Sequence, residues 1–470
     1  MTTYLSITEA AAALRAGEVT SVELVETALA NADRLDGELG VFIRRFPAEA
    51  HAAAVQADAE LAAGRDRGLL HGIPLGIKDI IATTEAPATA QSLVLDPEWS
   101  AAEGDAPVVA RLREGGGIVV GKTTTFEFAI GFPDPEKPFP IPANPWNPAH
   151  SPGGSSSGTG AGLPSGMFLG GLGTDTGGSV RMPAAFCGIS GLKQTFGRVP
   201  KSGCVPLGYT LDHIGPMART ARDCALMLAV MAGHDPSDHY SSDRPVDDYL
   251  AALTGDLSGL RIGVDTLERF GEPADPDLAG IVAEARAVLT AAGAQVVDVE
   301  LPLYRELVTA QNVTMSAEAA AYHLPDLTSR WQDYGRGARF YVGGGVAFSA
   351  PDYVQAQRVR RVGQKAVAEL FADVDLVVTP TSTLGAFALA DTKPTRTWET
   401  LAGLQTQYWN SVGNPSLSVP WGFTSTGLPL GMQISGRPFD EATVLRAGDA
   451  YQQRTDWHLR QPAITEPLPV

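Results

Sequence analysis

The pattern of hydrophobic and polar positions changes character along the chain. Over 1–65, apolar side chains recur at helical spacing, and two helices begin with capping boxes, at Ser6–Glu9 and Thr20–Glu23. A further helix is predicted around 53–61. The N-terminal part is therefore expected to consist of helices.

Beyond this part, short apolar runs alternate with helical segments. The runs predicted as strands are 71–81, 116–123, 260–265, 294–302, 374–381, 416–421 and 430–436. Helices are predicted over 219–232, 275–292 and 353–371. This alternation favours an α/β fold with a mixed, mostly parallel central sheet covered by helices on both faces.

One segment departs from this alternation. Residues of about 303–352, which include YGRGARFYVGGGVAFSAP, are predicted as a loop near a pocket. The aromatic residues of the segment either line an apolar pocket or belong to the core, and the sequence leaves both open. They are Tyr304, Tyr322, Trp331, Tyr334, Phe340, Tyr341 and Phe348.

Composition narrows the class of protein. The 470 residues are 44% hydrophobic and 19% charged, which is typical of a globular protein with a sizeable core. The N-terminus lacks a basic signal region, and no run of about 18 apolar residues predicts a membrane span. Cys187, Cys204 and Cys224 have no metal-type spacing and suit a reducing cytoplasm. The eight histidines show no zinc spacing either, so we expect no metal and no cofactor.

The charge balance bears on partners. With 35 basic and 53 acidic residues the formal net charge is −18. Phosphate binding needs a basic surface, so this balance argues against a nucleic acid partner. A local basic patch could still be hidden in the total.

Residues 151–183 form a segment rich in glycine and serine, with 11 Gly and 6 Ser in 33 residues. A flexible linker of this composition is polar throughout. This segment instead carries seven large apolar residues: Leu163, Met167, Phe168, Leu169, Leu172, Val180 and Met182. Burial of such a segment indicates close backbone packing, or backbone N–H groups aimed at a ligand.

Three short motifs match known patterns without their context. GGIVVGKT fits a phosphate-binding loop formally, but its apolar centre is predicted to be a strand itself. GSSSG fits a nucleophile elbow, yet no strand precedes it and neither His323 nor His458 has a distinctive setting as base. SGLK fits the S-x-x-K pattern of penicillin-recognising enzymes but lacks their other motifs.

The stretch GTDTGGSVR supports a chemical hypothesis. Gly177 and Gly178 allow backbone N–H groups to face one concavity, as an oxyanion hole requires, beside Ser179 as the nucleophile. Lys78 stands between apolar residues, and burial would lower its pKa enough for it to act as base, with Ser155 as a proton relay. The same spacing also fits a solvated lysine and serines in turns.

These residues carry a family resemblance. The motifs GIPLGIKD, PGGSS, GTDTGGSVRMPAAFCG and GLK resemble the amidase signature family, and the resemblance continues through TLDHIGPMART, VVTPT, GNPSLSVPWG and LPLGMQISG. It covers nearly the whole chain and implies one domain over 1–470. The parts we expect are N-terminal helices at 1–65, a catalytic core at 66–220, a variable substrate-shaping part at 221–370, and the C-terminal part of the core at 371–470.

The resemblance also implies roles for individual residues of a Ser–cis-Ser–Lys triad and its surroundings. These are Lys78 as base, Ser155 as relay in a cis peptide, Ser179 as nucleophile, the amides of Thr176, Gly177, Gly178 and Ser179 as oxyanion donors, Ser156 as support for the lysine, and Asp175 with Arg181 as the pair that holds the loop.

The implied activity is a bacterial, cytoplasmic amidase that cleaves C–N bonds through an acyl-enzyme. Its substrate is expected to be an anilide, a carbamate or a similar small amide, with urethane cleavage included and esters as side substrates. The expected partners are that small molecule, no nucleic acid and no membrane, with the chain a monomer or homodimer. The alternative is the amidase-like component (the A component) of a tRNA-dependent amidotransferase complex. KSGCVPLGYTLDHIGP is more similar to stand-alone amidases than to that component.

Overall fold

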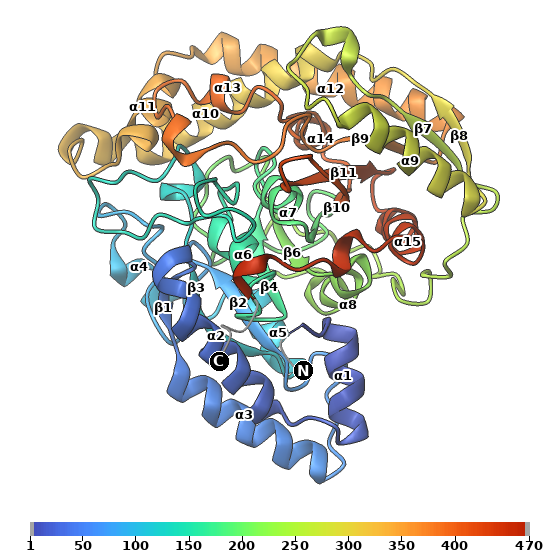
Figure 1. Cartoon of the computed structure of the whole chain (residues 1–470). Coiled ribbons are helices and arrows are strands. Elements are labelled where there is room, and N and C mark those ends of the chain that lie inside the picture. The colour runs from blue at the N-terminus through green and yellow to red at the C-terminus, as the bar shows by residue number, and fades with distance from the viewer. Residues whose placement is uncertain (1–3, 466–470) are drawn as a thin grey trace.

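The computed structural model, which describes residues 4–465, has an 11-stranded sheet at its centre (Figure 1). The strands are β1 (Phe42–Arg45), β2 (Pro74–Lys78), β3 (Ile118–Thr123), β4 (Gly170–Thr174), β5 (Ser190–Lys193), β6 (Ile214–Ala218), β7 (Arg261–Val264), β8 (Gln295–Asp298), β9 (Leu376–Pro380), β10 (Ser416–Phe423) and β11 (Pro429–Ser435). Their order across the sheet is β1-β3-β2-β4-β6-β5-β10-β11-β9-β7-β8.

The sheet is mixed, as predicted, but parallel pairs are the minority. Four neighbouring pairs run parallel, two around β2 and two around β7. Six pairs run antiparallel. The prediction of a mostly parallel sheet missed the antiparallel centre, because β4, β5 and β6 follow one another with short connections that helix periodicity does not reveal.

Helices flank this sheet and extend it at both ends (Figure 1). They are α1 (Ile7–Ala16), α2 (Ser21–Leu39), α3 (Pro47–Ala62), α4 (Pro97–Glu103), α5 (Pro107–Glu114), α6 (Ser157–Gly162), α7 (Arg181–Cys187), α8 (Ala221–Met231), α9 (Leu278–Ala291), α10 (Tyr304–Ser329), α11 (Arg336–Gly345), α12 (Ala350–Asp373), α13 (Thr397–Thr400), α14 (Gln407–Val412) and α15 (Glu441–Gln452). Both predicted capping boxes are present, at the starts of α1 and α2.

The segment 303–352 is helical, so its prediction as a loop is wrong. It holds the 26-residue helix α10 and the helix α11, in which three consecutive glycines weaken the intrinsic preference for a helix. Close packing of α11 on α10 explains the helix: a Cβ added to Gly345 would lie 2.1 Å from the carbonyl oxygen of Ser316. Tertiary contact therefore overrides local propensity here.

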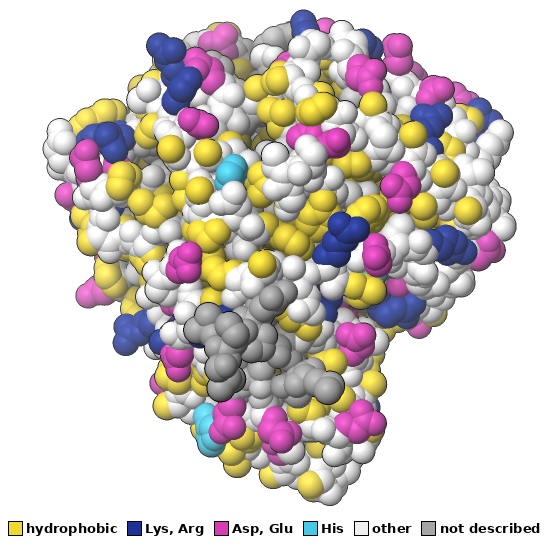
Figure 2. Space-filling view, viewed as in Figure 1, with side chains coloured by type: hydrophobic (Ala, Val, Ile, Leu, Met, Phe, Trp, Pro, Cys, Tyr) yellow, Lys and Arg dark blue, Asp and Glu magenta, His cyan; other side chains and the backbone are white. Residues whose placement is uncertain are grey.

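Charged side chains are spread over the surface. On the face shown in Figure 2, basic and acidic side chains are interspersed, and neither sign forms a continuous field. Within residues 4–465, no helix has both the length and the apolar character needed to span a bilayer.

Candidate active site

Lys78 is the last residue of β2, and its side chain is completely buried. Its Nζ lies 2.7 Å from Ser155 Oγ and 2.7 Å from Thr174 Oγ1. Burial in low-dielectric surroundings disfavours the ammonium form and lowers the pKa of Lys78 to about 7. The lysine can therefore be neutral near physiological pH while it is hydrogen-bonded to a serine hydroxyl.

The glycine-rich segment brings two serines to one cavity. The peptide bond between Gly154 and Ser155 is cis. A Cβ added to Gly154 would lie 2.3 Å from the ring of Phe126, so only glycine fits there. Ser155 and Ser179 both line a cavity of about 100 Å³, and Ser179 is partly exposed to it. The backbone N–H of Ser156 donates to the Ser179 carbonyl at 3.3 Å, which holds the two strands of the segment together.

The loop before Ser179 is held by its carbonyl groups. Gln311 Nε2 donates to the Thr176 carbonyl at 3.0 Å, and Thr406 Oγ1 donates to the Gly177 carbonyl at 2.6 Å. In a planar trans peptide the next N–H points opposite to the carbonyl. The N–H of Gly177 is therefore turned away from Gln311.

The four amides predicted as oxyanion donors are not equivalent. The Gly178 N–H already donates to Asp175 Oδ1 at 2.8 Å. The N–H groups of Thr176, Gly177 and Ser179 have no acceptor within residues 4–465. Gly178 has φ of +129°, and a Cβ there would lie 2.1 Å from Thr406 Oγ1, so this position requires glycine for its backbone and not for a free donor.

Asp175 and Arg181 form a fully buried pair beneath this loop, with 2.9 Å between Nη2 and Oδ1. Burial alone would raise the pKa of Asp175, but the neighbouring Arg181 guanidinium outweighs it and holds that pKa below its ordinary value. Arg181 also donates to Gln433 Oε1 at 2.8 Å and Asn410 Oδ1 at 2.6 Å. The pair thus ties the loop to β11 and α14.

Replacing Arg181 with methionine is expected to lower the free energy of unfolding by about 3–5 kcal/mol, because it leaves the Asp175 carboxylate buried without its cation. Urea unfolding followed by circular dichroism measures this. Arg330→Met is the matched control, since Arg330 pairs with Asp333 at the surface and an exposed pair contributes about 0–1 kcal/mol. Equal losses in the two variants would show that the buried pair has no special structural role.

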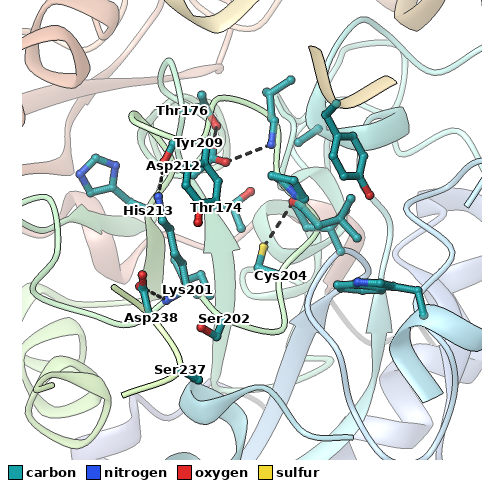
Figure 3. A pocket seen from close by; sticks show the side chains of 18 residues that line it. Thr174, Thr176, Lys201, Ser202, Cys204, Tyr209, Asp212, His213, Ser237 and Asp238 are labelled. Carbon is teal, nitrogen blue, oxygen red and sulfur yellow. Dashed lines mark hydrogen bonds between the residues drawn. The ribbon is translucent and has the colours of Figure 1, made fainter. Parts of the chain in front are cut away.

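Several residues around the triad escaped sequence reasoning. Thr174 accepts from Lys78, and Ser156, expected to support the lysine, instead bonds the Thr174 backbone, accepting from its N–H at 3.1 Å and donating to its carbonyl at 3.3 Å. Asp212 accepts from Thr176 Oγ1 at 2.5 Å (Figure 3). The motif position of Thr174, five residues before Ser179, was a signal; nothing in the sequence marked Asp212.

The wall of the cavity around Ser179 is apolar or polar without charge. Its lining includes no Asp, Glu, Lys or Arg within the described residues. Of the seven aromatic residues considered in the segment 303–352, Tyr341 lines this cavity. Tyr322 lines a neighbouring one, and Tyr304 stacks on Tyr408. Packing therefore accounts for most of these rings.

The neighbouring cavity, of about 170 Å³, reaches the far side of Thr174 (Figure 3). Unlike the cavity around Ser179, it is lined by charged groups, among them Lys201, Asp212 and Asp238. Burial lowers the pKa of Lys201 and raises that of Asp212. The two cavities thus present different chemistry on either side of the loop.

The other motifs have structural roles. The apolar centre of GGIVVGKT is strand β3, as predicted. His323 is buried against Phe128 and bonds Tyr334 through Nδ1 at 3.0 Å, outside the Ser179 cavity. Between residues 4 and 465, no group of three or more His, Cys, Asp or Glu side chains could hold a metal ion.

Comparison with known proteins gives two kinds of relative. The A component of the glutamyl-tRNA(Gln) amidotransferase of Chloroflexus aggregans is 41% identical over 487 residues, covering 98% of each chain. The solved structure of the peptide amidase from Stenotrophomonas maltophilia matches with a TM-score of 0.84 at 29% identity, covering 97% of this chain and 98% of that one. The 6-aminohexanoate cyclic dimer hydrolase matches with a TM-score of 0.87 at 25% identity, covering 99% of both chains.

These relatives correct the predicted partners. We expected a small-molecule partner alone, no nucleic acid, and a monomer or homodimer. A relative of this identity is one component of an amidotransferase named for a tRNA, so that prediction is wrong. The error lies in the use of net charge, which is a sum over the chain: a groove of about 610 Å³ is lined by Arg360, Arg361 and Arg437 in spite of the total of −18. The relatives favour the amidotransferase component over the stand-alone amidase.

The family itself is common to both kinds of relative. A sequence model of the Amidase family matches residues 23–445, which span the central sheet and the cavity that holds Ser155 and Ser179. The buried lysine, the glycine-rich segment and the mixed sheet all lie within this match. The chain therefore belongs to the amidase signature family.

Proposed function

We propose that this chain breaks the C–N bond of a carboxamide through an acyl-enzyme on Ser179. The observation that carries the proposal is the 2.7 Å hydrogen bond between Lys78 Nζ and Ser155 Oγ, in a cavity wall that also holds Ser179. A serine hydroxyl is a weak nucleophile until a base takes its proton. A lysine with a pKa of about 7 can serve as that base.

The proposed reaction has two halves. Neutral Lys78 takes a proton from Ser155, which takes one from Ser179 as Ser179 Oγ bonds to the carbonyl carbon. The oxyanion is stabilised by the free N–H groups of Thr176, Gly177 and Ser179. The C–N bond then breaks, the proton returns through Ser155 to the leaving nitrogen, and an ester remains. Water attacks this ester by the same proton path and releases the acid, which restores the enzyme.

The first candidate substrate is the side-chain amide of glutamine. The amidotransferase relative, at 41% identity over nearly the whole chain, supports this. In that role the released ammonia would pass to a partner protein, with which the chain would work in a complex.

The second candidate is an uncharged amide, such as an anilide, a carbamate including urethanes, or a primary aliphatic amide. A specific observation favours it: the lining of the Ser179 cavity carries no charged side chain among the described residues, whereas free glutamine brings an ammonium and a carboxylate. A cytoplasmic location suits either candidate, because Cys187, Cys204 and Cys224 are free thiols.

One assay series separates the candidates. Purified protein is given glutamine, an aryl acetanilide, the matching aryl carbamate and a primary aliphatic amide, and released ammonia or amine is followed beside the Ser179→Ala variant. Turnover of glutamine alone supports the amidotransferase component, and turnover of the uncharged substrates supports the second candidate. Turnover that persists in Ser179→Ala would contradict the proposed function.

Activity should rise with pH through the neutral range. The base must be uncharged, and the pKa of Lys78 is about 7, so kcat/KM should fall about tenfold per pH unit below that pKa and level off from roughly pH 8. A pH–rate profile with a substrate that does not itself titrate measures this. A flat profile from roughly pH 5 to roughly pH 10 would count against Lys78 as the base.

A further inference from the structure

Gln311, on α10, is buried and reaches the loop before Ser179. Its side chain lines the same cavity as Ser155 and Ser179. Nε2 donates to the Thr176 carbonyl at 3.0 Å, whereas Oε1 has no hydrogen-bond partner among residues 4–465. The Thr176 carbonyl can only accept, so the amide orientation is fixed and the oxygen is the unpaired atom.

An unpaired buried acceptor is unfavourable unless a ligand supplies a donor. The position of this acceptor is close to the proposed chemistry: a Cβ built on Gly177 would lie 3.1 Å from Gln311 Nε2. Gly177 is one of the residues whose free N–H groups are proposed to face the oxyanion. The carbonyl end of Gln311 thus belongs to the wall that a bound substrate would touch.

We infer that Gln311 determines specificity by accepting a hydrogen bond at Oε1 from the N–H of the amide that is cleaved. The inference rests on the proposed function and names its substrate class as amides that bear an N–H on the scissile bond. An ester with the same acyl and aryl groups has an oxygen in that place. Its lone pairs would face the Gln311 carbonyl, which then stays unpaired.

Thr406 shows what positioning alone requires. Its hydroxyl holds the next carbonyl, that of Gly177, at 2.6 Å. Thr406 Oγ1 does this with a single donor, and this side chain has no second polar atom to leave unpaired. A residue that only positioned the Thr176 carbonyl would need no second polar atom in the cavity. The unpaired oxygen of Gln311 therefore points to a role beyond positioning.

The test compares an amide and an ester that give the same acetyl-enzyme, 4-nitroacetanilide and 4-nitrophenyl acetate. Gln311→Met keeps an unbranched side chain of similar length and removes both polar atoms. The ratio of kcat/KM for the amide to kcat/KM for the ester should fall about tenfold or more, because one hydrogen bond to the amide is lost. Both substrates are measured on one preparation, so the ratio does not depend on the fraction of folded enzyme.

Thr406→Val is the matched control, and it should lower kcat/KM for both substrates alike. A Gln311→Met variant that also lowers both alike would overturn the inference and leave Gln311 as a positioning residue. If the unaltered protein released neither 4-nitroaniline nor 4-nitrophenol faster than Ser179→Ala does, the proposed function would fail and the inference with it. The two failures are distinct, because the first occurs in an active enzyme.

Discussion

Replacing Ser179 with alanine should lower kcat by about 10³-fold or more, because the nucleophile and the acyl-enzyme are both lost. The substrate is the one that the unaltered protein turns over fastest in the assay series. The effect should fall on chemistry and not on folding, since the Ser179 side chain is partly exposed to the cavity and bonds no residue among 4–465. Single-turnover release of amine or ammonia measures it.

A matched serine in the same glycine-rich segment provides the control. Ser165 is buried and donates to the Ala161 carbonyl at 2.7 Å, outside the lining of the Ser179 cavity. Ser165→Ala should change kcat by less than about twofold, as do most substitutions remote from the chemistry. Comparable losses in the two variants would mean that Ser179 acts through the structure of the segment.

Replacing Lys78 with methionine should lower kcat by about 10²–10⁴-fold, the contribution typical of a positioned general base. Methionine preserves the unbranched apolar stem within the buried site but cannot take the proton from Ser155, 2.7 Å away in the unaltered protein. The rise of kcat/KM through neutral pH should disappear with it. Steady-state rates across the pH range give both readouts.

Lys193 offers a control for burial as such. It is also fully buried, and desolvation lowers its pKa to about 7 as well. Its Nζ donates to the Asn414 and Gln194 carbonyls, neither of which can relay a proton. Lys193→Met should therefore leave the pH dependence of the remaining activity unchanged. A pH dependence that survives in Lys78→Met and vanishes in Lys193→Met would reassign the base.

Local chemistry in the sequence was enough to predict many elements. The capping boxes at Ser6 and Thr20 start helices, and the β-branched run before Lys78 forms β2. These signals depend on neighbouring residues alone. The motif spacing also placed Lys78, Ser155 and Ser179 as candidates, and the fold brings all three to one region.

Strand β4 shows what local pattern could not reveal. It contains three glycines, a composition more typical of a turn, yet it pairs with β2 and β6 near the centre of the sheet. A Cβ added to Gly173 would lie 2.7 Å from both Met217 Sδ and Ser156 Oγ, so glycine serves close packing there. Such a contact depends on residues that only the folded chain brings near.

The supporting residues were beyond sequence reasoning for the same reason. Thr406 is 229 residues from the carbonyl that it holds, and Gln311 is 135 residues from its acceptor. Neither residue type has a local signature for such a role. The uncharged lining of the cavity likewise comes from segments far apart in the chain, which is why the sequence left the substrate class open.

The most direct test is to label the nucleophile. An alkyl fluorophosphonate forms a stable ester with an activated serine, and proteolysis followed by mass spectrometry locates it. The expected result is one phosphonyl group on the peptide that contains Ser179, with activity lost in the same proportion and no label in Ser179→Ala or Lys78→Met at the same reagent dose. Loss of activity with the label on another residue, or full turnover by a protein labelled at Ser179, would contradict the assignment of Ser179 as the residue that carries the acyl group.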